Sequence, residues 1–470
     1  MSSKSGKSRR LHAIVLWTSV VVGIAVIVVG LEALRAATLK PVISIDYSQP
    51  LNKLANSRLP ADQAPADWQE LVRTAQSLKP HFPSGNEASP DEVVDALDAD
   101  AIAALRRLPS FSQAMRRWND VDSIALQMHM LREETTPLRG TARLLRLRLQ
   151  VAMKRDDVQL VRETMQQWSA LTAVCMHQPT YEAFISGTSI DNLLMLTIRE
   201  GVIKGEVTPA MARVMLESIA PRELPDHWDD FIEATRLKTR DMAQRVFTDD
   251  GEGDGRLIQS SFVSNLLNST PVSPSIDPTW KSALEERGCQ ASHWRNNMFK
   301  WNMPSRAACL ARSESALDEI REDFRKPRAQ RRSKSEWNAW KAGRTSLEDH
   351  VLPYWISLEL LPSSFDGAVS SRNACKILLA LVAHKGRTGS YPDTLDALVP
   401  QELSALPSDP MHASGAFIYR REGETFVLYS VGADGIDNGG RMLPKEPLRA
   451  LYDAEQGAGF DVVFTSPFEL

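Results

Sequence analysis

The sequence predicts a mainly helical protein with one N-terminal transmembrane helix and a small C-terminal α+β module. Three observations lead to this fold class: an uncharged apolar run near the N-terminus, a long succession of helical patterns, and alternating, Gly-rich sequence after Ala374. The chain has 470 residues, 43% of them hydrophobic, so it can bury a large core. A net charge of -4 gives no reason to expect nucleic acid as a partner.

The apolar run, residues 13–31 (AIVLWTSVVVGIAVIVVGL), contains no charged side chain. A helix of this length is about 28 Å long, close to the hydrocarbon thickness of a bilayer. Basic residues precede the run and Glu32 follows it, which places the N-terminus in the cytoplasm by the positive-inside rule. We expect a single-pass protein of the inner cell membrane with a periplasmic or other extracytoplasmic ectodomain. The alternative is a signal peptide, which needs a shorter apolar region and a cleavage site.

The long middle of the chain shows helical periodicity joined by short turns. Residues 141–153 and 158–174 read as two successive helices, and a further helix ends near Gly205. Thr208 is a predicted N-cap, with Pro209 at the first helical position. This order predicts an array of α-hairpins, either a protein-binding solenoid or an irregular helical domain, and no fixed repeat period decides between them.

Changes in composition divide the chain into segments. A polar, Pro-containing stretch follows the apolar run, and a Gly-, Ser- and Asp-rich stretch interrupts the helical patterns. The predicted organisation is a cytoplasmic tail (1–12), a transmembrane helix (13–31), an extended linker (32–66), a helical domain (67–248), a loop or hinge (249–275), a second helical segment (276–370) and the α+β module (371–470).

Motifs for catalysis or metal binding are missing from the sequence. The four cysteines form no CxxC pair, so a zinc site is not expected; Cys289 and Cys309 could form a disulfide, or all four could remain buried thiols. There is no HExxH, GxSxG, P-loop or GxGxxG after a strand. The basic run at 325–334 is expected to be a solvated loop or helix end, with an acidic partner or lipid as the alternative.

The C-terminal module has a different pattern. A helix around Cys375 is followed by a Gly-containing turn and a short helix opened by Pro392. Alternation predicts strands at 416–420 and 425–430, joined as a hairpin at Glu422 and Gly423. The next segment, VGADGIDNGG, is too rich in Gly, Asp and Asn for regular structure, and DVVF at 461–464 is one more predicted strand.

These C-terminal motifs resemble a known family. YPDTLDALVP, LPSDP, FIYR, FVLYSVGADGIDNGG and DVVF, in this order, are similar to the C-terminal half of the type II secretion major pseudopilins. The resemblance covers about a fifth of the chain. It implies a structural Ca²⁺ ion, and the matching positions are Asp434, Asp437, Asn438 and Asp461. The Gly residues of the loop let backbone carbonyls turn inward, as calcium requires; the alternative is Asx turns in a metal-free loop.

The resemblance implies a folded module rather than a role in a pseudopilus, because the processed leader of that family is not matched here. Similar modules end long bacterial envelope proteins with a helical middle, which the whole chain resembles better. We therefore expect a non-enzymatic, membrane-anchored envelope protein, a scaffold or secretion-associated component that acts through contacts with an unidentified envelope protein. The alternative is an envelope hydrolase with its site in the helical region.

Overall fold

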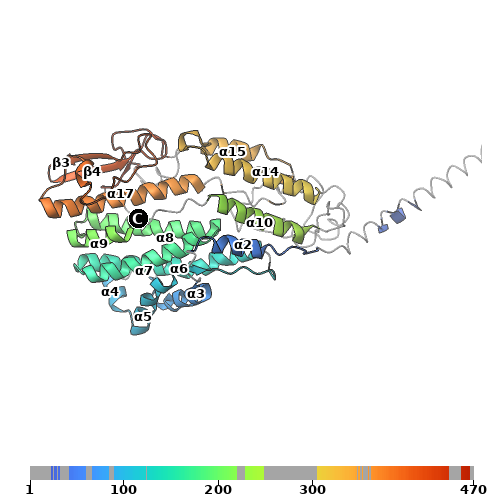
Figure 1. Ribbon diagram of the computed structural model, residues 1–470, viewed down its shortest axis with the longest axis horizontal. Helices are drawn as coiled ribbons and strands as arrows, with labels where there is room; N and C mark the ends of the chain where they lie inside the picture. Colours follow the sequence, from blue (N-terminus) through green and yellow to red (C-terminus); the bar gives the residue numbers. More distant parts are fainter. Residues whose placement is uncertain are drawn as a thin grey trace, which may run out of the picture. The chain divides into compact units, whose positions relative to one another are not determined.

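The computed structural model describes residues 23–24, 26–28, 30–31, 42–59, 66–83, 89–122, 124–219, 228–247, 304–346, 348–349, 352, 358, 361–443 and 457–465. Helices dominate this part of the chain (Figure 1), and two small sheets accompany them. Contacts divide the chain into two compact units. One contains residues 1–46, 239–315 and 343–354, and the other contains 47–238, 316–342 and 355–470.

The helices become longer toward the middle of the chain. The first are short: α2 (Ser48–Asn56), α3 (Trp68–Ser77), η1 (Lys79–His81), α4 (Pro90–Asp95), α5 (Ala99–Arg107) and η2 (Leu108–Phe111). Longer helices follow: α6 (Ile124–Lys154), α7 (Val158–His177), α8 (Tyr181–Ile203), α9 (Pro209–Ile219), α10 (Trp228–Val246) and α14 (Arg306–Phe324). The last are η4 (Arg328–Gln330), α15 (Lys334–Ala342), α17 (Leu361–Thr388) and η6 (Leu395–Leu398).

Local sequence signals set the helix ends of the array. The Asp157 side chain accepts from the Leu160 N–H at 2.9 Å and caps α7. Gly205 follows α8 with a φ of 70°, in the left-handed region that glycine adopts without strain. Pro209 occupies the first position of α9, as predicted. These ends confirm the helices expected between residues 141 and 220.

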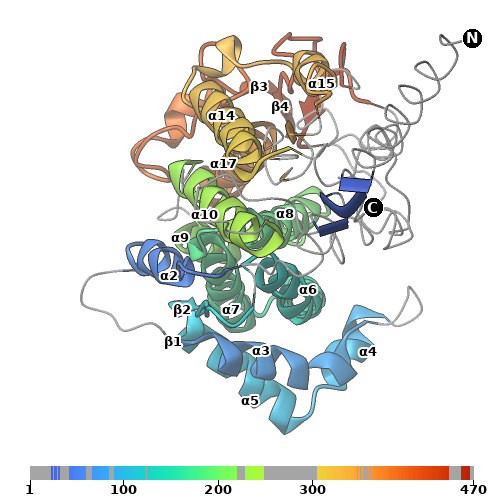
Figure 2. The ribbon, with the colours of Figure 1, turned by 90° about the vertical axis from the view of Figure 1, so that its right-hand side faces the viewer.

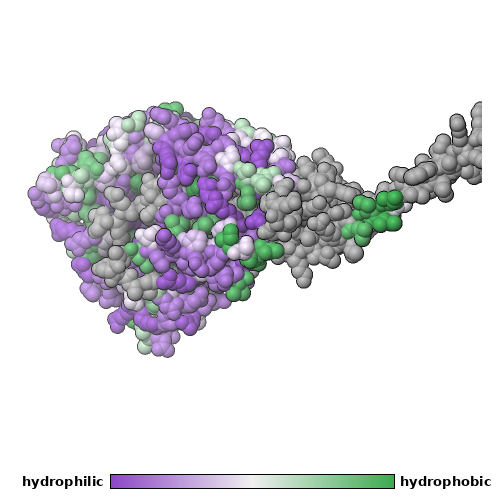
Figure 3. Space-filling model, turned by 45° about the vertical axis from the view of Figure 1, so that its right-hand side comes forward, coloured by the Kyte–Doolittle hydropathy of each residue, from purple (hydrophilic) through white to green (hydrophobic). Residues whose placement is uncertain are grey.

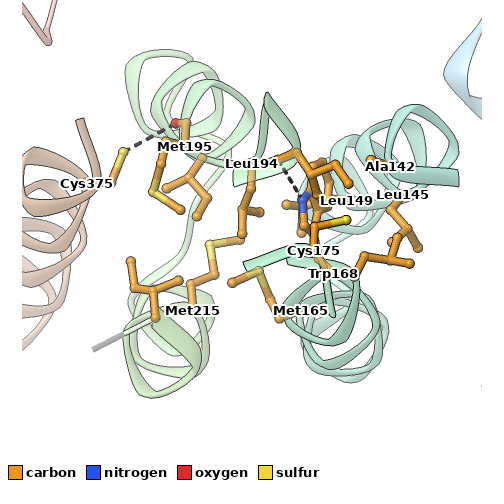
Figure 4. Close-up of a cluster of buried hydrophobic side chains, with 14 of the residues drawn as sticks. Ala142, Leu145, Leu149, Met165, Trp168, Cys175, Leu194, Met195, Met215 and Cys375 are labelled. Atoms are coloured by element: carbon orange, nitrogen blue, oxygen red, sulfur yellow. Dashed lines mark hydrogen bonds between the residues drawn. The ribbon is translucent and has the colours of Figure 1, made fainter. Parts of the chain in front are cut away.

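The core of the larger unit lies between α6, α7, α8, α9 and α17, which pack side by side (Figure 2). Figure 4 shows its buried Leu, Met and Trp side chains. Trp168 is fully buried and donates through Nε1 to the Ile190 carbonyl at 3.0 Å, so its one polar group is satisfied. Cys375 of α17 donates to the Met195 carbonyl of α8 at 3.3 Å.

A second buried cluster in this unit is aromatic. Phe184 lies 5.0 Å from Phe231 between ring centroids, and Trp228 lies 5.3 Å from Phe324 and 5.0 Å from Phe365. The last two are edge-to-face contacts, which ring quadrupoles favour. The cluster joins α8, α10, α14 and α17.

The C-terminal module combines α17 with a three-stranded antiparallel sheet in the order β3-β4-β5. Strand β3 (Ile418–Glu422) and β4 (Thr425–Ser430) form the predicted hairpin, and β5 (Val462–Val463) lies within the predicted last strand. Gly423 in the turn has a φ of 63°. A separate parallel pair joins β1 (Ala66–Asp67) to β2 (Ala114–Met115).

In the smaller unit, a glutamine side chain forms hydrogen bonds with the backbone of an extended segment. The Gln244 amide oxygen accepts from the N–H groups of Ser44 and Ile45 at 3.2 Å, and its nitrogen donates to the Ile45 carbonyl at 2.8 Å. In the same unit, Arg240 pairs with Glu314 at 2.7 Å. The three Gln244 hydrogen bonds satisfy the backbone N–H groups of Ser44 and Ile45 and one carbonyl of this extended segment.

The predicted transmembrane helix, and with it the single-pass inner-membrane localisation, is corrected by the structure. Among the described residues, no helix is long and apolar enough to cross a membrane. Of residues 13–31, only 23–24, 26–28 and 30–31 are described, fewer than the about 20 residues that a helical span needs. Two of these described residues, Ile24 and Val28, are exposed. Where the face drawn in Figure 3 is coloured, it is mostly hydrophilic outside this segment. The mainly helical fold with a small sheet region agrees with the prediction.

Two further segments differ from expectation or lie beyond the described residues. Part of the predicted extended linker (32–66) is the helix α2. Its Leu51 and Ala55 form an apolar stripe on one side, and both side chains are buried. The predicted hinge at 249–275 lies outside the described residues.

Candidate functional site

The Gly-rich loop, residues 431–442, follows β4. Its glycines at 432, 435, 439 and 440 all have φ between 71° and 82°, a region that L side chains rarely adopt. At its end, Met442 pairs with Asp461 in an isolated parallel bridge. The loop thus lies against the segment that begins β5, as the sequence order suggested.

Two acidic residues close the loop on itself. One carboxylate oxygen of Asp434 accepts from the Ile436 N–H at 3.1 Å, and one of Asp437 accepts from the Gly439 N–H at 2.8 Å. Both are bonds from residue i to i+2, which define Asx turns. The second Asp434 oxygen accepts from the Gly459 N–H at 2.9 Å and joins the loop to the start of the last strand.

Asp461 is the buried centre of the site. Its carboxylate accepts from the Asn438 N–H at 3.0 Å and from the Gly440 N–H at 2.7 Å. The side chain has no exposed surface. Burial raises the pKa of Asp461 above its ordinary value, and these two N–H donors partly oppose that rise because they favour the charged form.

The structure therefore brings the four predicted residues together, but through backbone hydrogen bonds. Asn438 donates through its side-chain nitrogen to the Ile436 carbonyl at 2.8 Å. No group of three His, Cys, Asp or Glu side chains in the described part of the chain could hold a metal ion. In this conformation the carboxylates serve N–H groups, which fits the Asx-turn alternative. Calcium binding remains a prediction.

Tyr429 of β4 extends this network. Its hydroxyl donates to the Asp437 carboxylate at 3.0 Å. Burial, followed by this hydrogen bond, raises the pKa of Tyr429 to about 12. The hydroxyl therefore stays protonated at neutral pH and acts as a fixed donor to the loop.

Sequence reasoning missed an arginine that braces the same loop. Arg328 of η4 donates to the Ala433 carbonyl at 2.7 Å and pairs with Asp366 of α17 at 3.4 Å. Arg331 reaches the same carboxylate at 3.1 Å. The basic run at 325–334 is thus engaged with acidic side chains and carbonyls of its own chain. Its charge was visible in the sequence, but its partners were not.

Asp409, in the LPSDP motif, is a second missed residue. It is fully buried, and its carboxylate accepts from Ser370 Oγ at 2.9 Å and from the Met411 N–H at 3.0 Å. Burial raises the pKa of Asp409 above its ordinary value. Ser370 belongs to α17, so Asp409 fastens the motif to the long helix.

The last strand is held by Arg199 of α8. Its guanidinium donates to the Phe464 carbonyl at 2.9 Å and to the Val463 carbonyl at 2.6 Å, and it lies 5.7 Å from the Phe464 ring centroid. Burial lowers the pKa of Arg199 to about 10, so the group remains charged at neutral pH. The helical array therefore supplies a cation that fixes the strand next to Asp461.

A second buried arginine joins α17 to the array. Arg372 forms a salt bridge with Asp191 of α8 and donates to the Ile219 carbonyl at 3.2 Å. Both side chains of this pair are buried. Two buried cations, Arg199 and Arg372, thus connect the C-terminal module to helices more than 150 residues earlier in the chain.

The His412–Ser414 pair and three cysteines have structural roles. His412 Nδ1 lies 2.5 Å from Ser414 Oγ, but the same ring nitrogen accepts from the Ser414 N–H, so this pair closes an exposed turn. Cys175, Cys309 and Cys375 are buried free thiols, and burial raises the pKa of each to about 12. Such thiols are poor nucleophiles.

One large apolar side chain projects from the loop. Ile436 is the last residue of the first Asx turn, directly before the second, and is 61% exposed. Because hydrogen bonds fix the backbone on both sides, this side chain is presented in a defined position.

Comparisons of the chain with known protein families, with curated proteins and with solved structures found no match.

Proposed function

We propose that this chain is a non-enzymatic scaffold that acts through protein contacts of its C-terminal module. The observation that supports this most directly is the braced Gly-rich loop. The carboxylates of Asp434, Asp437 and Asp461 hold the backbone, and Arg328 holds the loop from outside. Groups used in this way build a rigid surface rather than perform chemistry.

Rigidity favours binding, because a preorganised loop loses little conformational freedom on association. Ile436 is the apolar anchor of this surface, and the negative charges of Asp434 and Asp437 flank it in the sequence. A fitting partner would offer an apolar pocket with a basic rim. A role in secretion rests on the resemblance to pseudopilins alone and is part of this proposal. Among the described residues, no cluster favours the hydrolase alternative.

The test is site-specific crosslinking of the full chain in extract from its own cells. A photoreactive residue at position 436 should capture a defined protein, whereas one at the exposed Glu424 should not. Ile436→Asp should weaken the complex by roughly tenfold or more, and Ile436→Val should weaken it little. Equal capture at positions 436 and 424, or an unchanged complex with Ile436→Asp, would contradict the proposal.

A further inference from the structure

Asn438 is the one asparagine in the sequence that is followed by glycine. The side chain of an asparagine in this position can react with its own backbone, because glycine has no side chain to shield the next peptide nitrogen. Gly439 is exposed, and a Cβ added to it would meet no atom within 4 Å, so this side of the loop leaves space for the reaction. Asn438 itself is partly exposed.

Three hydrogen bonds restrain the reacting groups. The Asn438 side-chain nitrogen donates to the Ile436 carbonyl at 2.8 Å, and the Asn438 N–H donates to the Asp461 carboxylate at 3.0 Å. The Gly439 N–H donates to the Asp437 carboxylate at 2.8 Å. The Gly439 nitrogen must lose this proton, and the Asn438 side chain must turn toward that nitrogen. The loop therefore has to open before the reaction can occur.

Local opening is easier here than in the helical core. Residues 432–441 belong to no helix or strand, and the two hydrogen bonds made by the Asn438 side chain and the Gly439 N–H are exposed to solvent. Segments with these properties open at a lower free energy than buried helices. Opening is a minor excursion, so it leaves the loop closed most of the time while it sets the reaction rate.

We propose that Asn438 is a self-modification site, which converts to aspartate or isoaspartate and thereby releases the loop. The Gly439 nitrogen attacks Cγ of Asn438. A new N–Cγ bond forms, the Cγ–Nδ2 bond breaks, and Nδ2 leaves as ammonia with the proton of the Gly439 N–H. Water then hydrolyses either C–N bond of the cyclic imide, which gives aspartate or isoaspartate.

The products cannot restore the hydrogen bonds of the closed loop. A carboxylate at position 438 has no N–H to donate to the Ile436 carbonyl, and its negative charge is unfavourable beside that oxygen. In isoaspartate the backbone also runs through Cβ. This change lengthens the chain between the N–H groups of residues 438 and 440, which both donate to Asp461. The segment that presents Ile436 therefore loses its fixed position.

The test is mass-spectrometric peptide mapping of the full chain, folded and incubated at neutral pH for several weeks. Asn438 should gain the mass that replaces an amide by a carboxyl group, and part of the product should be isoaspartate. Asn56, which is exposed but followed by Ser57, is the control within the chain and should change far less. A chain whose Asn438 stays intact, or reacts no faster than Asn56, overturns the inference.

The restraint by the loop is tested separately. Asp461→Ala removes an acceptor that holds the loop closed, so Asn438 should convert roughly tenfold faster. Circular dichroism verifies that the variant is folded. The wild-type chain unfolded in urea gives the unrestrained rate, which should exceed the rate of the folded chain. Equal rates in the folded and unfolded wild type, or a folded Asp461→Ala variant that reacts like wild type, would refute control by loop opening.

Hydrogen exchange followed by mass spectrometry measures the release of the loop. After incubation, residues 431–442 should exchange roughly tenfold faster than in the fresh chain, because lost hydrogen bonds lower local stability. Asn438→Gln retains an amide but would need a larger ring to react, so its exchange should not change with incubation. Incubated wild-type chain that exchanges like fresh chain overturns the release step.

Loss of partner binding through Ile436 would follow from this release, and this consequence alone rests on the proposed function. A chain that converts at Asn438 and loosens its loop, but never captures a protein at position 436, would contradict the proposed function and leave the modification site intact. Capture at position 436 by a chain whose Asn438 never converts would do the reverse.

Discussion

Buried charges are handled differently in the helical array and in the Gly-rich loop. In the array, Asp191 is paired with the guanidinium of Arg372 from another helix. In the loop, Asp461 is paired with backbone N–H groups. The reason is the backbone itself: helix interiors satisfy their own N–H groups, so a buried carboxylate there needs a side-chain cation, whereas an irregular loop has N–H groups to offer. Position in the fold therefore decides what each carboxylate binds.

We expect the largest loss of stability when the buried ion pair of the helical array is broken. Arg372→Met leaves Asp191 buried without its cation, and we expect a loss of about 3–5 kcal/mol in the free energy of unfolding. The double variant Arg372→Met/Asp191→Leu removes both charges and should recover most of that loss. Urea unfolding followed by circular dichroism measures both. Equal stability of the single and double variants would show that the pair is not coupled.

A calcium titration tests whether the loop carboxylates bind a cation as well as backbone N–H groups. If the predicted ion binds, calcium at about 100 times its dissociation constant should stabilise the chain by about 2.7 kcal/mol, and a chelator should reverse this. Asp434→Ala should abolish the response, and Glu424→Ala should leave it unchanged. Thermal melting is the measurement. No shift with calcium in the wild-type chain would remove the metal and leave the Asx turns as the whole role of the loop.

Removal of the Asp461 carboxylate tests whether the loop depends on an acceptor for its backbone N–H groups. Asp461→Ala removes the acceptor of the part-buried N–H groups of Asn438 and Gly440, and the loss of two hydrogen bonds should cost about 1–3 kcal/mol in the free energy of unfolding. Asp461→Asn keeps one acceptor oxygen and should cost less. Denaturant midpoints compare the two variants. If the alanine variant were as stable as wild type, the loop would not depend on this acceptor.

A pH series tests the buried Asp409. Its raised pKa means that the folded chain holds this proton at a pH where the unfolded chain has released it. Stability should therefore fall as pH rises from the ordinary Asp value of 3.8 through the folded pKa. Asp409→Asn should remove that part of the decrease, because an amide does not titrate in this range. Melting curves from about pH 4 to about pH 7 decide; a parallel pH dependence in the variant would refute this role.

The smallest effect is expected at an exposed pair. Arg325 and Asp229 are 60% and 59% exposed and lie 2.7 Å apart, so Arg325→Ala should change stability by less than about 0.5 kcal/mol. Arg328→Ala should cost more, because it also leaves the Ala433 carbonyl without its donor. Unfolding midpoints of the two variants give the comparison, and a larger loss for Arg325→Ala would reverse the expected order.

The candidate site was only partly predictable from the sequence. Asp434, Asp437, Asn438 and Asp461 were named because they match positions of the pseudopilin family, and the Gly-rich composition of the stretch agreed with that match. The metal role was an implication of resemblance, and the hydrogen bonds show a second use for the same oxygens. Arg328 was missed, since only its charge was visible and Ala433 is 105 residues away.

Local signals in the sequence determined the helices, their caps and the C-terminal hairpin. Asp157, Pro209 and Gly423 act on neighbouring backbone groups, so their consequences follow from nearby residues. Only the tertiary structure decided which groups Arg199, Arg328 and Arg372 bind and whether the loop carboxylates meet N–H groups or one another. Those partners lie far along the chain, and burial, which makes their pairing necessary, exists only after the chain has folded.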